Sequence, residues 1–317
     1  VSMRRRILAA VSVSAVLLTG LAGCSAADAA SGADCTAALQ PGALSNGVEL
    51  RGLDAGTPDV RIGGSTDIVN AQRSVLRRAE AGEAGETIRG GEVVTANVTI
   101  YDSESGESLA PTQRRFLQAM PQDILPELKK YMASENSDSL VYTDLLMAGL
   151  VCSAPGDVLA VAMTAGQAAS SQISDRATVM VVEVLDAHDS TARGANRALP
   201  WGFPALTEDE TGRPGLVLPP QSAPGEQRVA TAIAGSGAEV TADDYMIGNV
   251  LTVGWNDHRV RENTWDSTLV EIGSESQLAD YDFRPALTGQ TVGSRVVVLD
   301  PNDGDPVVHV IDIIAVG

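Results

Sequence analysis

Aromatic and basic side chains are scarce in this sequence of 317 residues. Phe, Trp and Tyr make up only 3% of it, so any hydrophobic core must consist mainly of Val, Leu, Ile and Ala. Lys and Arg number 22 against 41 Asp and Glu, which gives a formal net charge of −19. Because binding to a polyphosphate requires a basic surface, this composition argues against a nucleic-acid partner. The length is sufficient for about two domains of ordinary size.

Histidine and cysteine are also few, which limits the chemistry that the chain can carry out. The three histidines, His188, His258 and His309, lie far apart in the sequence, and no GxSxG motif accompanies them, so no serine-hydrolase triad is predicted. The three cysteines form no CxxC motif, and the acidic residues at 300–305 lack the glutamate that completes a calcium loop. We therefore expect no metal ion and no cofactor.

The first residues have the features of an export signal. Residues 4–6 (RRR) precede an apolar stretch at residues 7–18, which is too short to favour a membrane-spanning helix. Residues 21–24 (LAGC) resemble the lipobox of bacterial lipoproteins, in which Cys24 receives the lipid. We expect a signal peptide at residues 1–23 and a protein anchored through Cys24 to the extracytoplasmic face of the cell membrane. An ordinary signal peptide with a chance cysteine is the alternative.

Cys35 and Cys152 remain once Cys24 is assigned to the lipid. Two thiols outside the cytoplasm are expected to pair as a disulfide. Such a bond would close a long loop, which stabilises the folded state by about 4 to 5 kcal/mol at best. Two independent buried thiols are the alternative.

Two segments of small and polar residues divide the chain. The first, at residues 24–43, predicts a flexible tether after the anchor, and the second, at residues 188–199, predicts a linker. They separate two larger segments, which we call the first half (residues 44–187) and the second half (residues 200–317).

The two halves contain similar motifs in the same order. Residues 56–62 (GTPDVRI) and 212–218 (GRPGLVL) both place a proline turn before a short apolar strand. Near the end of each half lies a run rich in β-branched residues, at 176–187 (RATVMVVEVLDA) and at 306–317 (PVVHVIDIIAVG). This repetition predicts a duplicated domain.

Each half is predicted to contain about five strands and one short helix. The β-branched runs are typical of strands, and the polar residues Glu183 and Asp312 within them suggest that one strand face is exposed. A helix that covers one face of an antiparallel sheet gives an α+β fold. The prediction is therefore an α+β protein with two tandem domains, each a curved antiparallel sheet around one short helix.

Four motifs of the second half resemble, in the correct order, those of FKBP-type peptidyl-prolyl cis-trans isomerases. They are residues 250–255 (VLTVGW), 265–268 (WDST), 279–290 (ADYDFRPALTGQ) and 292–301 (VGSRVVVLDP). The resemblance covers residues 222–317. The first half resembles the same domain more faintly and lacks the WDS motif, so we expect it to be inactive or to act as a binding and spacing module.

By this resemblance, the second half has an aromatic cleft that holds a prolyl ring. Trp255, Trp265 and Phe283 would form its walls and floor, and Asp266 would lie on its rim; these are the expected catalytic residues. The expected substrate-binding residues are Ala279, Asp280, Tyr281 and His309. Seven of the eleven aromatic residues lie between positions 201 and 283, which favours a cleft, although each tryptophan could instead belong to a core.

The resemblance implies peptidyl-prolyl isomerase activity on exported polypeptides that contain Xaa-Pro bonds. These bonds rotate slowly because amide resonance must be lost, and an apolar cleft favours the twisted amide without any nucleophile. The loop before the last strand is shortened to residues 302–306 and lacks the family's tyrosine, so turnover is expected to be weak. In the first half only Tyr101 could serve as a cleft aromatic. The alternatives are a non-catalytic chaperone or peptide-binding module that uses the same cleft, and a purely structural double domain.

Overall fold

The computed structural model describes residues 35–317, apart from positions 54–56, 81–84, 135, 267–268 and 278–280. The predicted signal peptide, the lipidation residue Cys24 and much of the predicted tether lie outside the described residues. The described part of the chain forms two larger antiparallel sheets, one in each half, with few helices. The predicted α+β architecture is thereby confirmed. No helix in the described ranges is long and apolar enough to cross a membrane.

The sheet of the first half has five strands, all antiparallel to their neighbours. Their spatial order is β3 (Gln72–Arg77), β6 (Val158–Met163), β7 (Thr178–His188), β4 (Val93–Asp102) and β5 (Gln113–Gln118). Val, Ile and Thr are frequent in β4 and β7, as expected for strands that pack on both sides.

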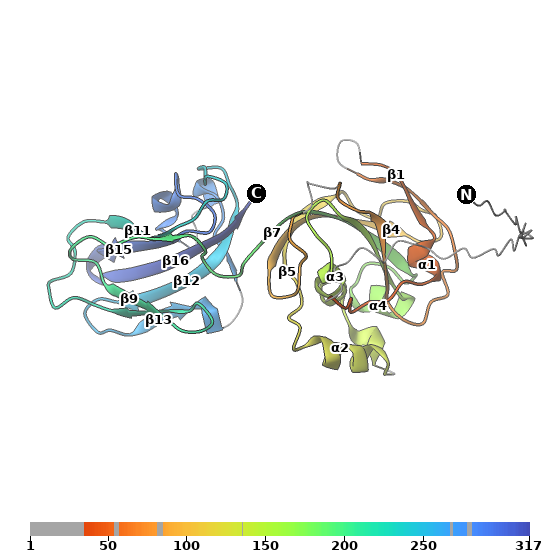
Figure 1. The fold of residues 1–317 in the computed structure, drawn as a ribbon, viewed down its shortest axis with the longest axis horizontal. Coiled ribbons are helices and arrows are strands. Elements are labelled where there is room, and N and C mark those ends of the chain that lie inside the picture. Colours follow the sequence, from red (N-terminus) through yellow and green to blue (C-terminus); the bar gives the residue numbers. More distant parts are fainter. Residues whose placement is uncertain (1–34, 54–56, 81–84, 135, 267–268, 278–280) are drawn as a thin grey trace, which may run out of the picture. The chain divides into compact units, whose positions relative to one another are not determined.

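Both faces of this sheet are covered. Figure 1 shows α3 (Tyr142–Leu150) within the curve of the sheet, where Leu145 and Leu146 belong to the same buried cluster as Val161 of β6. The opposite face is covered by the hairpin of β1 (Val48–Gly52) and β2 (Asp59–Ile62), whose apolar side chains pack against Val158 and Val179. The other helices of this half are α1 (Ala43–Asn46), α2 (Leu125–Met132), α4 (Ala165–Ser170) and the 3₁₀ helix η1 (Ser137–Ser139). The prediction of one short helix is therefore wrong for the first half.

The sheet of the second half has seven strands. Six of them follow the order β8 (Ala195–Asn196), β11 (Arg228–Ala234), β15 (Arg295–Asp300), β16 (Val307–Val316), β12 (Met246–Gly254) and β13 (Val260–Asn263), and β14 (Val270–Glu271) also pairs with β12. The strands β15, β16 and β12 lie side by side (Figure 1). Because β8 lies within the predicted linker, part of that segment is built into the second sheet.

One face of the second sheet is covered by a short helical segment. This is the 3₁₀ helix η4 (Arg284–Leu287), and it buries Leu287 together with the preceding Phe283 against residues of β12, β15 and β16. The single short helix predicted here is therefore one 3₁₀ turn. Pro285 stands at its start, and Gly289 follows it with a φ of 82°, a conformation that favours glycine, so the segment has no room to extend. The other 3₁₀ helices of this half are η2 (Thr264–Asp266), η3 (Glu275–Gln277) and η5 (Asn302–Gly304).

The other face of the second sheet is covered by a hairpin. Strands β9 (Ala205–Glu208) and β10 (Pro214–Val217) form it, and Leu206 and Leu216 pack against the buried cluster that contains Val297 and Val308. The central strand β12 is covered on both sides, and all nine of its residues are buried.

The two halves have the same topology. The order β3-β6-β7-β4-β5 of the first sheet corresponds, strand for strand along the chain, to the order β11-β15-β16-β12-β13 of the second. In each half a hairpin precedes these strands, and the two proline-turn motifs noted in the sequence lead into its second strand, β2 or β10. The predicted tandem arrangement is confirmed at the level of strand order.

The prediction of an exposed strand face at Asp312 is wrong, and Glu183 is half-buried. Asp312 is fully buried on β16, where its two carboxylate oxygens accept hydrogen bonds from Nε (2.6 Å) and Nη2 (2.8 Å) of Arg295, itself only 1% exposed. Arg295 also donates to the backbone carbonyl of Gly212 (2.7 Å) and to the carboxylate of Glu208. This buried ion pair therefore connects the hairpin β9–β10 to the sheet beneath it.

Cys35 and Cys152 form a disulfide in the structure, with Cα atoms 5.7 Å apart and a separation of 117 along the sequence. Cys35 precedes α1, and Cys152 follows α3. Because Cys35 lies in the segment predicted as a flexible tether, the bond fixes the end of that segment to the helix that covers the first sheet, and the nearby Leu39 is buried there.

Candidate functional site

The direction of side chains along β12 decides which predicted residues can line a cleft. Successive residues of a strand point to opposite faces. Leu251, Val253 and Trp255 point to the hairpin side, whereas Val250 belongs to the cluster on the η4 side. Thr252 lines a pocket together with Phe283, so it also faces the η4 side.

The two tryptophans predicted as cleft walls therefore lie on the wrong side of the sheet. Trp255 is 4% exposed within the hairpin-side cluster, and its Nε1 donates to the carbonyl of Gln221 (3.2 Å). Trp265 packs against the same cluster, with its ring centroid 5.8 Å from the guanidinium carbon of Arg295. Because a shift of one residue in a strand moves a side chain to the other face, the aromatic at the end of the VLTVGW motif was assigned to the wrong face.

Tyr101 in the first half has the same kind of position as Trp255. It is 3% exposed, packs in the hairpin-side cluster of its own sheet, and donates its hydroxyl hydrogen bond to the carbonyl of Pro58. Burial raises the pKa of Tyr101 to about 12. Tyr101 is therefore a core residue, and the prediction that it could line a cleft in the first half is wrong.

Three of the predicted residues do meet, on the η4 side of the second sheet. The ring of Phe283 lies with its centroid 5.0 Å from that of Tyr281 and 4.7 Å from that of His309, at interplanar angles of 40° and 49°. Phe283 is 1% exposed, so it forms a floor, and tilted ring pairs at these distances are favourable. A pocket of about 520 Å³ opens here, lined by Thr252, Arg261, Glu262, Tyr281, Asp282, Phe283, Asp300, Asn302, Asp305, Val307 and His309. We call it the Phe283 cleft.

His309 is a neutral wall of this cleft. Its Nδ1 lies 2.9 Å from Oγ1 of Thr252, and the two share a hydrogen bond. Burial lowers the pKa of His309 to about 4, although the negative charges of Asp300 and Asp282 oppose this shift. At neutral pH the imidazole is therefore uncharged and acts as a flat, weakly polar surface next to Phe283.

The residues of the cleft that were missed in the sequence include Thr252 and Glu262 on its walls. Thr252 stands directly opposite His309 on β16 and opposite Glu262 on β13, so three neighbouring strands bring these side chains together. Glu262 accepts a hydrogen bond of 2.8 Å from the hydroxyl of Tyr281. For Thr252 the signal is that it is the one hydroxyl residue within the motif VLTVGW, whereas no comparable signal marks Glu262.

Other predicted residues are only partly described. The backbone of Asp266 belongs to η2, but its side chain is not described, and Ala279 and Asp280 lie outside the described residues. In the described part of the chain, no group of three or more His, Cys, Asp or Glu side chains is placed to hold a metal ion.

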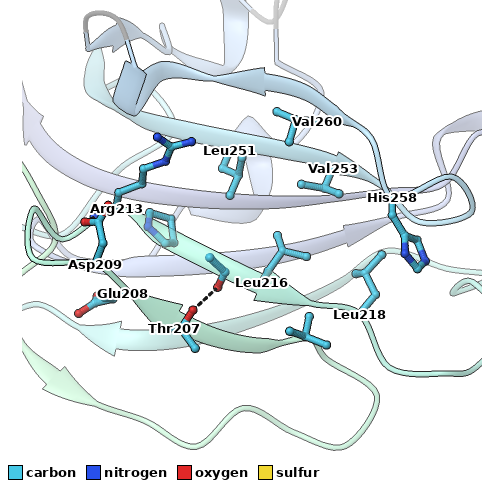
Figure 2. Close-up of a pocket in the computed structure, with 13 residues that line it drawn as sticks. Thr207, Glu208, Asp209, Arg213, Leu216, Leu218, Leu251, Val253, His258 and Val260 are labelled. Carbon is cyan, nitrogen blue, oxygen red and sulfur yellow. Dashed lines mark hydrogen bonds between the residues drawn. The ribbon is translucent and has the colours of Figure 1, made fainter.

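A second pocket lies on the hairpin side of the same sheet. Figure 2 shows Leu216 and Leu218 of the hairpin segment pointing toward Leu251 and Val253 of β12, with Asp209 and Arg213 at one end and His258 at the other. Its volume is about 570 Å³. The apolar part of this lining is aliphatic and contains no aromatic ring, so this pocket lacks the flat surfaces of the Phe283 cleft.

No family model matches the chain, and no curated protein matches its sequence. Three solved structures illustrate what the fold is similar to. The three FKBP domains of wheat FKBP73 share 9% identity over 78% of this chain and 95% of that chain, with a TM-score of 0.28. FKBP12 from Mycobacterium tuberculosis shares 18% identity over 30% of this chain and 86% of that chain (TM-score 0.24), and the N-terminal domain of FKBP42 from Arabidopsis thaliana shares 10% over 42% and 98% (TM-score 0.26).

All three structures are FKBP domains, single or in tandem, which is the family that the sequence motifs resemble.

Proposed function

We propose that the second half is an FKBP-type peptidyl-prolyl cis-trans isomerase and that the Phe283 cleft is its active site. The observation that carries this proposal is the buried ring of Phe283 with the rings of Tyr281 and His309 tilted against it. A prolyl ring is compact and apolar, and it packs against such a surface. The motifs of the second half that resemble the isomerase family support the same reading.

The proposed mechanism requires no nucleophile. Rotation about an Xaa-Pro bond is opposed by a barrier of about 18 to 20 kcal/mol, because the planar amide loses its resonance when it twists. The twisted amide is less polar than the planar one, so a surface that excludes water favours it relative to the ground state. His309 suits this role because its imidazole is neutral at pH 7 and brings no charge next to the twisting bond.

The proposed substrates are exported polypeptides that contain Xaa-Pro bonds. This part of the proposal depends on the export signal and lipobox resemblance at residues 1–24, which would place the cleft on the extracytoplasmic face of the membrane. Mass spectrometry of the mature chain can detect a lipid attached to Cys24. An unmodified Cys24 in membrane fractions would contradict the proposed lipid anchor.

A non-catalytic peptide-binding module is the second candidate. It is favoured by the polar residues Thr252 and Glu262 on the cleft walls, and by the short turn at η5, where the isomerase family has a longer loop with a tyrosine. In this case the same cleft would hold a prolyl ring without accelerating its rotation.

Exchange NMR on a proline-containing tetrapeptide distinguishes the two candidates, because it measures cis-trans exchange and binding in one sample. The full chain should accelerate exchange, and Tyr281→Ala should lower kcat/KM by about twofold to tenfold, the value of one aromatic contact. Trp265→Phe is the matched control, because it changes an aromatic residue on the hairpin side of the sheet. The indole Nε1 of Trp265 has no hydrogen-bond partner among the described residues, so the substitution should leave kcat/KM unchanged. Binding without faster exchange would support the second candidate, and neither binding nor exchange would refute both.

A further inference from the structure

The Phe283 cleft has an apolar floor but an acidic rim. Its lining includes the carboxylates of Glu262, Asp282, Asp300 and Asp305, and Arg261 is the one basic residue among the lining residues. The rim therefore carries more negative than positive charge.

The one cation of the lining is already neutralised. Arg261 lies 2.9 Å from a carboxylate oxygen of Asp257 and 3.5 Å from one of Asp305. In contrast, no ion pair joins Glu262, Asp282 or Asp300 to a basic side chain in the described ranges of the chain. Three carboxylates are thus left without a cation of their own around the cleft.

These three carboxylates come from three different elements. Glu262 lies on β13, Asp282 lies two residues before the start of η4, and Asp300 ends β15. Asp282 and Asp300 are close enough for their charges to act on the imidazole of His309, which stands against the floor. A peptide whose proline rests on Phe283 would place its neighbouring side chains within this negative field.

We infer that the cleft prefers peptides that carry lysine or arginine next to the proline, and that Glu262, Asp282 and Asp300 determine this preference. The inference rests on the proposed function, since it concerns the substrate of the same cleft. A cationic neighbour gains attraction from the rim, whereas an acidic neighbour is repelled, and both effects weaken as salt screens the charges.

Three peptides that differ only in the two residues flanking the proline test the inference: Lys-Pro-Lys, Gln-Pro-Gln and Glu-Pro-Glu in one neutral framework. With the full chain at low salt, the lysine peptide should have a kcat/KM about threefold to tenfold above that of the glutamine peptide, and the kcat/KM of the glutamate peptide should fall below both. In 0.5 M salt the Debye length is only about 4 Å, so the differences between the three peptides should become smaller.

Variants identify the residues responsible. The double substitution Asp282→Asn with Asp300→Asn should bring the ratio of kcat/KM for the lysine peptide to kcat/KM for the glutamine peptide most of the way to one. Asp303→Asn is the matched control, because Asp303 carries the same charge on the neighbouring turn η5 but does not line the cleft. It should leave the preference intact.

The outcomes separate the inference from the proposed function. Equal kcat/KM values for the lysine and glutamine peptides, or a lysine preference that persists in the double variant, would overturn the inference and leave the isomerase standing. If none of the three peptides is isomerised, the proposed function is refuted and the inference falls with it.

Discussion

The buried pair of Arg295 and Asp312 should be the most sensitive polar contact of the second half. Its members are 1% and 0% exposed, and they face each other in a two-point arrangement with both hydrogen bonds shorter than 3 Å. Arg295→Met removes the cation and fills much of the space that it leaves. Asp312 then keeps only the hydrogen bond from the backbone N–H of Ala192 (2.8 Å).

The expected loss follows from leaving one charge buried without its partner. Breaking a buried ion pair in this way costs about 3 to 5 kcal/mol, whereas replacing both members by apolar residues is close to neutral. Arg295→Met should therefore lower the free energy of unfolding by about 3 kcal/mol or more, and Arg295→Met with Asp312→Leu should recover most of it. The carbonyl of Gly212, which loses a donor in both variants, limits the recovery.

The loss should depend on pH with a defined sign. Burial raises the pKa of Asp312, and Arg295 opposes this rise. Without Arg295 the folded-state pKa moves further above the unfolded value of about 3.9, so folding takes up a proton in the interval between them. Stability of the variant relative to the wild type should therefore be best at acidic pH and should decline as pH rises through the folded-state pKa of Asp312.

Urea unfolding followed by tryptophan fluorescence is a suitable assay, because all three tryptophans lie at or after position 201 and report on the second half alone. The wild type, the single variant and the double variant are compared at pH 5 and pH 8. A loss below 1 kcal/mol for Arg295→Met at both pH values, or a double variant as unstable as the single one, would refute the reasoning.

Two further predictions concern other contacts. The folded-state pKa of His309 is about 4, below its ordinary value near 6.5. Between these two values the folded state binds fewer protons than the unfolded state, so stability that is present above pH 6.5 is lost as pH falls toward 4. Between pH 7.5 and pH 5 the free energy of unfolding of the wild type should fall by about 2 kcal/mol because of His309, and His309→Asn should remove this part of the decrease. An equal decrease in both proteins would contradict the prediction. Reduction of the Cys35–Cys152 bond should destabilise the first half by up to about 4 to 5 kcal/mol, seen as faster amide exchange in β3 to β7, while the tryptophan signal of the second half stays unchanged. Slower or unaltered exchange after reduction would speak against it.

Much of the fold could be predicted from the sequence because its signals are local. Runs of β-branched residues indicate strands wherever they occur, and the proline-turn motifs recur at corresponding places in both halves. Phe283, Tyr281 and His309 could be selected because the motifs around them resemble those of a known family. The structure brings the three rings together.

The orientation of the strands could not be predicted in the same way. Polar and apolar residues alternate along a strand only when one face meets water, and both faces of β12 are covered, so its sequence gives no indication of which side Trp255 occupies. Asp312 was expected at the surface because a polar residue within a run of β-branched residues suggests that one strand face is exposed. Its partner Arg295 stands on the adjacent strand, and only the register between the two strands brings them together.

The hairpins β1–β2 and β9–β10 limit where the chain can be divided. Each precedes the five main strands of its half and shields the side that the helical segment leaves open. A fragment that begins after either hairpin would expose a contiguous apolar patch on that side of the sheet, and such patches promote association.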